Sequence, residues 1–143
     1  MDGKKSSMRE YINGVIYKSL PKEIKEIIID TFVVSGHGVT DKTNFITIDK
    51  LYLLSTKEVW GGSLSYDTAT AATRQLDYYK EKGVTTNNYS GAIKKYNGSA
   101  YYWWLRSAYS YNTFSFYRVN NYGGWGSNTA VNTFGVASAF RIG

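Results

Sequence analysis

The sequence predicts one α+β domain in which helices pack around a small, mainly antiparallel sheet. Three observations support this fold class. The 143 residues suit a single domain that can bury a sizeable core. Helix signals lie within residues 1–100, which we take as the scaffold of the domain. Residues 101–143 contain apolar runs rich in aromatic and β-branched residues, which are typical of strands.

Two helices are predicted near the N-terminus. Ser7 and Glu10 form a capping box that starts the first helix, and the Asn-Gly pair at 13–14 is typical of a helix end. The second helix follows Pro21, because proline suits the first turn of a helix. Its apolar side chains are spaced for one stripe and comprise Ile24, Ile27 and Ile28.

Two further helical segments are predicted later in the scaffold. Ser55 and Glu58 form a second capping box, which starts a short turn that ends at residues 60–62. Residues 68–82 form the last predicted helix, with Gly83 as its C-terminal stop. Two of its side chains are expected to face the core, Leu76 and Tyr79.

The scaffold also contains strand patterns. Residues 31–34 are β-rich and predict a strand, which residues 35–38 break. Residues 44–54 hold two apolar runs and are predicted as a buried strand. Residues 84–99 contain several turn-forming residues and are predicted as a loop.

The strand pattern is strongest in the C-terminal part. Residues 101–105 lack alternation, which predicts a central strand that is buried on both faces. Residues 116–119 form a second strand candidate, and residues 120–124 supply turn chemistry. Residues 125–131 are predicted either as a returning strand or as an irregular loop, and residues 136–142 as the closing strand.

The composition argues against most kinds of enzyme. The chain has no Cys, so disulfides, thiolate metal sites and Cys-His catalysis are excluded. Its one histidine, His37, lies between glycines in a predicted loop, and the acidic residues form no recognisable carboxylate pair or calcium loop. The tail has no carboxylate, so a lectin-type calcium site is not expected there. We therefore expect no enzyme activity, no cofactor and no metal.

Charge and hydropathy give two further expectations. No apolar stretch is long enough to span a bilayer and no signal-like run follows the N-terminus, so membrane insertion is not expected. The net charge of +6 raises the question of nucleic acid. However, the tail carries only three cations, Arg106, Arg118 and Arg141, and the lysines lie outside it. Nucleic acid is therefore not the expected partner, although stacking of single-stranded bases on the aromatic tail stays as an alternative.

Several motifs resemble the variable proteins of diversity-generating retroelements, in the form found in gut bacteria and their phages. They are WWLRS at 103–107, FYRVN at 116–120, and Gly135-Val136 followed by Ala139-Phe140. SMREYIN at 7–13 and DKLYLLS at 49–55 are also similar, so the resemblance covers most of the chain. The chain departs from the family at Ala108, where proline is frequent, and at residues 137–138, where the family often has Arg-Pro.

The resemblance implies a C-type-lectin-like fold with a fixed frame and a displayed part. Residues 101–107 and 136–142 would form the frame, and residues 109–134 would vary between copies. In such systems an error-prone reverse transcriptase randomises template adenines, and Asn codons ending in a pyrimidine are frequent targets. From Leu105 onward, Trp125 is the only residue that such changes could not produce.

The displayed part has the composition of an antibody paratope, in which Tyr and Phe give contact area and short polar residues give adaptable hydrogen bonds. The candidate aromatic anchors are Tyr109, Tyr111, Phe114, Tyr122, Trp125 and Phe134. The other candidate contacts are Asn112, Ser127, Asn128, Thr129, Val131, Asn132 and Arg118, the last of which could pair with a partner carboxylate. Four aromatic residues are assigned to the core instead: Trp103, Trp104, Phe116 and Phe140. Arg106 is expected to satisfy backbone carbonyls or a buried carboxylate.

Together these features predict a non-enzymatic binding protein. Its partner would be a protein or glycan on a cell or phage surface, and the domain would belong to a phage virion or a bacterial cell surface. Two alternatives remain, a single-stranded nucleic-acid-binding module and a static carbohydrate-binding lectin-like domain. The sequence specifies neither the ligand nor the oligomeric state.

Overall fold

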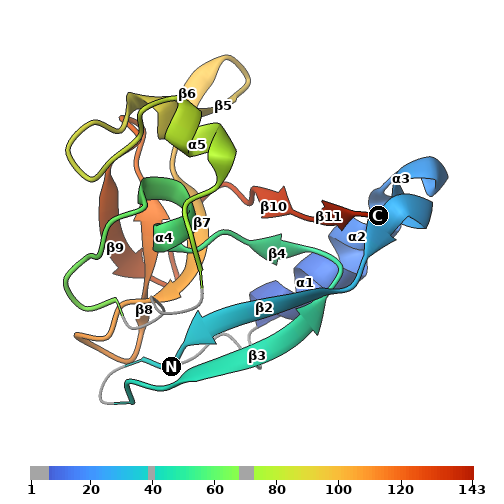
Figure 1. Ribbon diagram of the computed structural model, residues 1–143, viewed down its shortest axis with the longest axis horizontal. Coiled ribbons are helices and arrows are strands. Elements are labelled where there is room, and N and C mark those ends of the chain that lie inside the picture. The colour runs from blue at the N-terminus through green and yellow to red at the C-terminus, as the bar shows by residue number, and fades with distance from the viewer. Residues whose placement is uncertain (1–6, 39–40, 68–72) are drawn as a thin grey trace.

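The computed structural model describes residues 7–38, 41–67 and 73–143 (Figure 1). It is a small mixed α/β domain in which most strands belong to small antiparallel sheets and a few helices cover them. The helices are α1 (Ser7–Tyr11), the π-helix η1 (Ile12–Ile16), α2 (Tyr17–Ser19), α3 (Lys22–Ile27), α4 (Thr56–Trp60), α5 (Asp77–Glu81) and the 3₁₀ turn η2 (Ser90–Ala92).

The strands form five small sheets among the described residues. They are β1 (Ile28–Ile29), β2 (Thr31–Gly36), β3 (Asn44–Asp49), β4 (Tyr52–Leu53), β5 (Lys94–Tyr96), β6 (Ser99–Tyr101), β7 (Trp103–Ala108), β8 (Ser115–Val119), β9 (Trp125–Thr129), β10 (Ser138–Ala139) and β11 (Arg141–Ile142). β2 pairs with β3, β5 with β6, and β7, β8 and β9 form a three-stranded sheet. All of these pairings are antiparallel.

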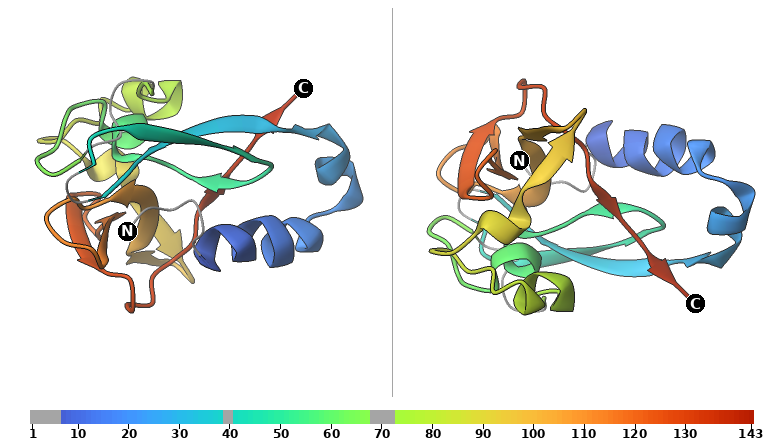
Figure 2. Two further views of the ribbon diagram at one scale, coloured as in Figure 1. Left: turned by 90° about the horizontal axis from the view of Figure 1, so that it is seen from below. Right: turned by 90° about the horizontal axis from the view of Figure 1, so that it is seen from above.

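The C-terminal segment ties the two ends of the fold together. β10 pairs with β4, and β11 pairs with β1, so the last strand lies on the first. Figure 2 shows this segment crossing between the helix α1–α2 on one side and the β2–β3 hairpin on the other. The predicted closing strand of residues 136–142 is therefore two short strands, because each half meets a different partner.

The strand β7 separates two clusters of buried side chains. Trp103 and Leu105 belong to one cluster, which also contains Trp60 and Tyr117. Trp104 belongs to the other cluster, with residues from the N-terminal helix and β4. The prediction of a strand buried on both faces is thus confirmed for residues 103–105.

Arg106, the next residue of β7, joins four elements. Its Nη1 donates to Glu58 Oε2 at 2.5 Å and to the Leu53 carbonyl at 2.8 Å. Its Nε and Nη2 donate to the Val34 carbonyl at 3.2 and 3.0 Å. The expectation that Arg106 serves backbone carbonyls or a buried carboxylate is confirmed, and both kinds of partner are present.

The second capping box is confirmed by its hydrogen bonds. Ser55 Oγ accepts from the Glu58 N–H, and the Glu58 carboxylate accepts from the Ser55 N–H at 2.7 Å. Gly61 ends α4 in the left-handed conformation with φ +74°. Glu58 therefore serves two roles, as the cap of α4 and as the partner of Arg106.

The first helix differs from the prediction at its end. It continues through the π-helix to Ser19 instead of ending at Asn13-Gly14. The reason is that Asn13 bonds elsewhere: its Oδ1 accepts from the N–H groups of Lys50 and Leu51, and its Nδ2 donates to the Leu51 carbonyl. Its side chain thus holds the turn between β3 and β4.

The same turn splits the predicted strand of residues 44–54 into β3 and β4. The expectation of a buried strand is wrong for β3, whose side chains alternate between exposed and buried. The break predicted to begin at residue 35 is two residues too early, because β2 continues to Gly36.

Other helix and loop predictions are corrected by tertiary pairing. The predicted apolar stripe of the second helix holds only in part. Ile24 and Ile28 pack in the smaller core, but Ile28 leaves the helix to pair with Ile142, and Ile27 is exposed. Within residues 68–82 only α5 is helical; residues 68–72 lie outside the described part, and residues 73–76 are extended or irregular. The predicted loop of residues 84–99 contains η2, β5 and the start of β6.

Two aromatic residues do not lie where the sequence placed them. Phe140 is 41% exposed and so is not a core residue. It is the single residue between β10 and β11, which pair with different strands, so it belongs to neither pairing. Tyr101 ends the β5–β6 hairpin and is exposed, so the central strand begins only at Trp103. Tyr79 is buried and Leu76 packs against the core, as predicted.

The Arg106 network gives a stability prediction. We expect Arg106→Leu to lower the free energy of unfolding by about 3–5 kcal/mol, because it removes the cation that pairs with the half-buried Glu58 carboxylate and the donors that bond two backbone carbonyls. Urea denaturation followed by circular dichroism measures this change. Lys22→Ala is the control, because its ion pair with Glu26 is exposed and we expect a change within about 0.5 kcal/mol. Equal effects of the two substitutions would contradict the role of Arg106.

Candidate functional site

The sheet β7–β8–β9 positions the displayed part of the chain. Residues opposite each other in an antiparallel pair share a face of the sheet. Tyr117 pairs with Ser127 and faces the larger core, whereas Arg118 pairs with Gly126 on the other face. The alternation along β8 therefore separates the fully buried positions 115, 117 and 119 from the half-buried Phe116 and Arg118.

The candidate contact residues gather at the two ends of this sheet. At one end, the loop after β7 and the loop after β9 lie side by side, since the Ala130 N–H donates to the Phe114 carbonyl. At the other end lies the turn between β8 and β9. The five-residue strands separate the two ends by roughly 16 Å.

Most of the predicted contact residues at the ends are exposed. Those at the loop end include Tyr111, Phe114, Val131 and Asn132, and those at the turn end are Tyr122 and Trp125. Tyr111 and Tyr122 are each about 70% exposed, so neither contributes much to the core. Asn112 is half-buried in the loop after β7, and Ser127, Asn128 and Thr129 are half-buried in β9.

An aromatic cluster supports the loop end. Tyr66 makes edge-on contacts with Tyr109 and Tyr111, with ring centroids 5.3 and 5.2 Å apart. Tyr109 in turn lies edge-on to the buried Tyr117 at 5.5 Å. Tyr109 is half-buried, so it packs beneath the exposed ring of Tyr111 and has little surface available to a partner.

Hydrogen bonds fix the backbone beneath this cluster. The Tyr66 carbonyl accepts from the Ser110 N–H at 2.8 Å, and Tyr66 itself has φ +65°, which is strained for a tyrosine. The Tyr117 hydroxyl donates to the Ser65 carbonyl. Burial raises the pKa of Tyr117, so the phenol stays neutral and remains a donor. Sequence reasoning missed Tyr66, because no local pattern shows that residues 65–66 reach the β7–β8 loop.

The turn end is fixed in a similar way. Asn120 Oδ1 accepts from the N–H groups of Tyr122 and Gly124, both at 2.9 Å. The Gly123 carbonyl accepts from the indole of the buried Trp60 at 3.1 Å. Tyr122 therefore projects from a turn that is bonded to the core.

Arg118 lies within the sheet and does not point away from it. Its Nε donates to Asn128 Oδ1 at 2.8 Å, and its guanidinium lies 5.1 Å from the centre of the Tyr102 ring. Burial lowers its pKa, and its Nη1 is buried without a hydrogen-bond partner among the described residues. The Cβ of any larger residue at Gly126 would collide with this guanidinium. The structure thus uses Arg118 and Asn128 to bind β8 to β9.

Phe134, also predicted as an aromatic anchor, packs within the domain. Its ring packs against Trp104 and Tyr102, with centroids 4.7 and 5.1 Å apart. It is half-buried and packs against the smaller core. The predicted contact set therefore contains an exposed group and a supporting group, and Phe134 belongs to the second.

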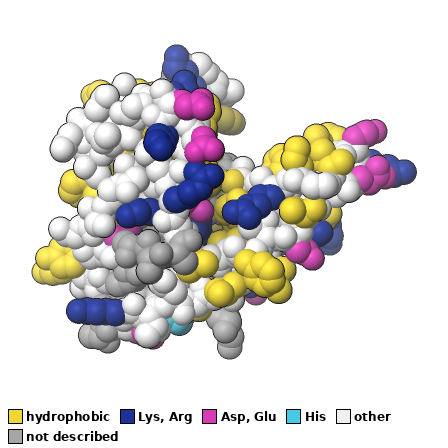
Figure 3. Space-filling view, viewed as in Figure 1, with side chains coloured by type: hydrophobic (Ala, Val, Ile, Leu, Met, Phe, Trp, Pro, Cys, Tyr) yellow, Lys and Arg dark blue, Asp and Glu magenta, His cyan; other side chains and the backbone are white. Residues whose placement is uncertain are grey.

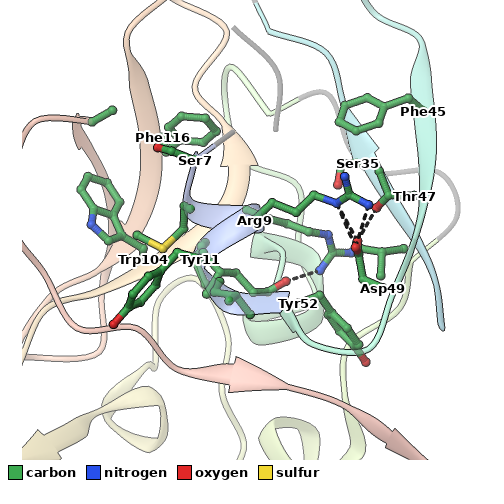
Figure 4. A pocket seen from close by; sticks show the side chains of 17 residues that line it. Ser7, Arg9, Tyr11, Ser35, Phe45, Thr47, Asp49, Tyr52, Trp104 and Phe116 are labelled. Atoms are coloured by element: carbon green, nitrogen blue, oxygen red, sulfur yellow. Dashed lines mark hydrogen bonds and ion pairs between the residues drawn. The ribbon is translucent and has the colours of Figure 1, made fainter. Parts of the chain in front are cut away.

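A cavity of ≈ 830 Å³ lies behind the displayed sheet, and the sequence did not predict it. Figure 4 shows Trp104 and Phe116 on one side of it and Phe45, Thr47 and Asp49 of β3 on the other. Most of its lining is apolar. Phe116, which the sequence assigned to the core, is half-buried in the wall of this cavity, so that assignment holds only in part. The lining residues come from six separate segments, which explains why no local motif revealed the cavity.

The charges in this cavity are paired with one another. Arg9 donates from Nε to both Asp49 oxygens at 2.9 and 3.1 Å, and its Nη2 lies 2.7 Å from Oδ1. The Thr47 hydroxyl donates to Asp49 Oδ2 at 2.6 Å. The Arg9 side chain joins the N-terminal helix to β3, so this pair holds the helix against the hairpin.

The described residues contain no group of three or more His, Cys, Asp or Glu side chains that could hold a metal ion. The ring centroids of His37 and Phe45 lie 4.8 Å apart. The Nε2 atom of His37 lies 3.9 Å from Asp41 Oδ2. In the described part of the chain, no helix has the length and apolar character needed to cross a membrane.

The fold and the surface define a small mixed α/β domain with aromatic side chains displayed from fixed loops. A family model described as a domain of unknown function (DUF6273) matches residues 4–143. The chain belongs to this family. No curated protein and no solved structure matches the chain.

The turn that displays Tyr122 gives a second prediction. We expect Gly123→Ala to lower the free energy of unfolding by more than about 2 kcal/mol, because a Cβ there would collide with the Tyr89 carbonyl and φ is +86°. Thermal or urea unfolding measures this change.

Gly98→Ala is the matched control for this substitution. Gly98 has a similar φ of +82°, but a Cβ there would meet nothing within 4 Å, so only about 1 kcal/mol of backbone strain is expected. The difference between the two variants isolates the steric contact of the turn with the core. If the two variants lose the same stability, the turn is not held as described.

Proposed function

We propose that this domain is a non-enzymatic ligand-binding protein that displays a diversified aromatic and polar surface on a C-type-lectin-like scaffold. The observation that carries the proposal is the contrast between exposed side chains and fixed backbone. Tyr111 and Tyr122 are each about 70% exposed, yet their loops are hydrogen-bonded to buried or strained positions of the frame. A pre-ordered loop loses little conformational entropy when it binds.

The pairing of β11 with β1 supports the scaffold part of the proposal. In a domain whose terminal strands form the frame, the displayed segment lies between two fixed points of the chain. Here β7 fixes its start through the buried residues 103–105, and β10 fixes its end through β4. The exposed positions within residues 109–134, such as Tyr111 and Tyr122, can then change in sequence without changing either anchor.

The exposed side chains suit a partner with an extended surface. The two aromatic ends are separated by roughly 16 Å, which exceeds the size of one monosaccharide. Tyrosine and tryptophan carry much of the energy of many interfaces, and short polar residues adapt to the partner. We therefore propose that the partner is a protein or a glycan chain on a cell or phage surface, and that the domain is part of a phage virion or a bacterial surface.

Sequencing of the flanking DNA tests how the surface arose. The proposal predicts a nearby near-copy of the codons for residues 109–134 that differs mainly where the copy has adenine, together with a reverse transcriptase gene. If both are absent, the diversification part of the proposal is wrong, and a static binding domain remains.

A binding experiment tests the surface itself. We expect Tyr111→Ser/Tyr122→Ser to weaken binding to the best ligand from arrays of glycans and bacterial surface proteins by at least about tenfold, because exposed tyrosines at such positions act as anchors. Thermal unfolding should change little, since both side chains lie outside the core clusters.

Tyr78→Ser/Tyr96→Ser is the matched control. These tyrosines are similarly exposed, at 58% and 66%, but lie outside the displayed part. We expect this variant to bind as the wild type does. Equal loss in both variants, or no loss in the first, would exclude the proposed surface.

A further inference from the structure

The β2–β3 hairpin has its polar and apolar faces reversed relative to an ordinary two-stranded sheet. An antiparallel sheet with one face in water usually turns its apolar side chains inward. Here four of the six inward positions are polar, namely Thr31, Ser35, Thr47 and Asp49, while Val33 and Phe45 are apolar, and all six are buried. Four of the six outward positions carry apolar side chains.

The outward apolar face is made of two cross-strand pairs. Phe32 pairs with Ile48, and Val34 pairs with Ile46. Phe32 is 72% exposed, and Ile46 and Ile48 are 59% and 56% exposed. Figure 3 shows hydrophobic side chains gathered over this part of the molecule. We call this set of four residues the outer hairpin face.

Contacts on the inward face fix the register of the two strands and so determine which side chains face solvent. Asp49 binds Arg9 and Thr47, and the Val34 carbonyl at the edge of β2 accepts from Arg106. A shift of one residue would exchange the two faces and break these contacts. The apolar face is therefore held in solvent by interactions on the other side of the sheet, and contiguous apolar surface of this kind marks an interaction site.

From this reversal we infer that the outer hairpin face is a homodimer interface, in which a second copy of the chain packs its own hairpin face against the first. This inference does not depend on the proposed function. The face is formed by β2 and β3, whereas the displayed residues surround β8 and β9, so a dimer leaves them open (Figure 1).

The charges around the face favour a second copy over a charged partner. The six outward positions of the two strands, which are Phe32, Val34, Gly36, Asn44, Ile46 and Ile48, carry no charge. One end of the hairpin is flanked by Lys50 and Asp30, paired at 3.0 Å. The other end is flanked by Asp41 and Lys42. Each end thus carries one positive and one negative side chain, so the net charge of +6 is not concentrated where two copies would meet.

The area is sufficient for a weak dimer. A fully exposed large apolar side chain has a surface of roughly 180 Å². With their exposed fractions, Phe32, Ile46, Ile48 and Val34 together expose about 350 Å² of apolar surface per copy. Two copies would bury about 700 Å² of apolar surface, and such surface makes up only about 60% of a typical interface. The whole interface would then be on the order of 1,200 Å², the lower end of the range for specific complexes.

Sedimentation velocity over about a hundredfold range of concentration, starting in the low micromolar range, tests this inference. We expect a reversible monomer–dimer equilibrium for the wild type. Ile46→Thr/Ile48→Thr should weaken association by at least about tenfold, since it removes apolar area at the centre of the face while keeping β-branched side chains that suit a strand. Circular dichroism and thermal unfolding check that the variant stays folded.

Val15→Thr/Val131→Thr is the matched control, because both valines are exposed but lie outside the face. It should dimerise as the wild type does. A wild type that stays monomeric at every concentration overturns the inference, and a partner other than a second copy then covers the face. A dimer that the two Ile→Thr substitutions leave unchanged also overturns it.

Cross-linking gives a second readout that does not depend on the double variant. The chain has no cysteine, so Ile46→Cys would carry its only thiol. At concentrations where the wild type dimerises, mild oxidation should give a covalent dimer of Ile46→Cys. Val131→Cys, placed in the displayed part, should stay monomeric under the same conditions. Equal cross-linking of the two variants overturns the inference.

Discussion

The ion pair between Arg106 and Glu58 is the interaction on which most of this structure depends. The arginine leaves β7 and reaches the carbonyl of Val34 in β2, the carbonyl of Leu53 in β4 and the carboxylate that caps α4. These elements are distant in sequence. The planar guanidinium suits the role, because it presents five donors in fixed directions. Without it, β7 would lose its side-chain hydrogen bonds to β2 and β4, whereas the hydrogen bond from the Thr56 N–H to Ser107 would still join α4 to β7.

The motif around Arg106 explains how one short strand can organise two cores. Trp103 and Leu105 enter the larger cluster, Trp104 enters the smaller, and the fully buried Ser107 accepts from the Thr56 N–H at 3.1 Å. Successive residues of a strand point to opposite faces, so a run of apolar residues is required where both faces are buried. This is why the sequence alone predicted the buried residues 103–105, although β7 begins at Trp103 and not at Tyr101. The role of Arg106 followed from its position beside this apolar run.

Features that depend on distant partners could not be predicted in the same way. The Asn-Gly pair at 13–14 has the local chemistry of a helix end, but Asn13 instead holds the turn at residues 50–51. Ile28 continues a helical stripe by spacing, but its pairing with Ile142 draws it into a strand. The exposed part of the candidate surface followed from composition. Tyr66 and the cavity arise only from the meeting of separate segments, which spacing along one segment does not encode.

The supporting residues limit how much of the tail can vary. Arg118 lies over Gly126 and binds Asn128, while Phe134 fills the space beside Trp104. A change at any of these positions alters how β9 or the final segment packs, whereas a change at Tyr111 or Tyr122 alters mainly surface. A displayed surface that must accept many sequences therefore needs its variation confined to the loop and turn ends of the sheet. The same division, with a fixed inner side and a free outer side, recurs in the β2–β3 hairpin, where Asp49 and Arg9 hold the strands and leave an apolar face outward. In both places, polar contacts within the domain determine which side chains are available to a partner.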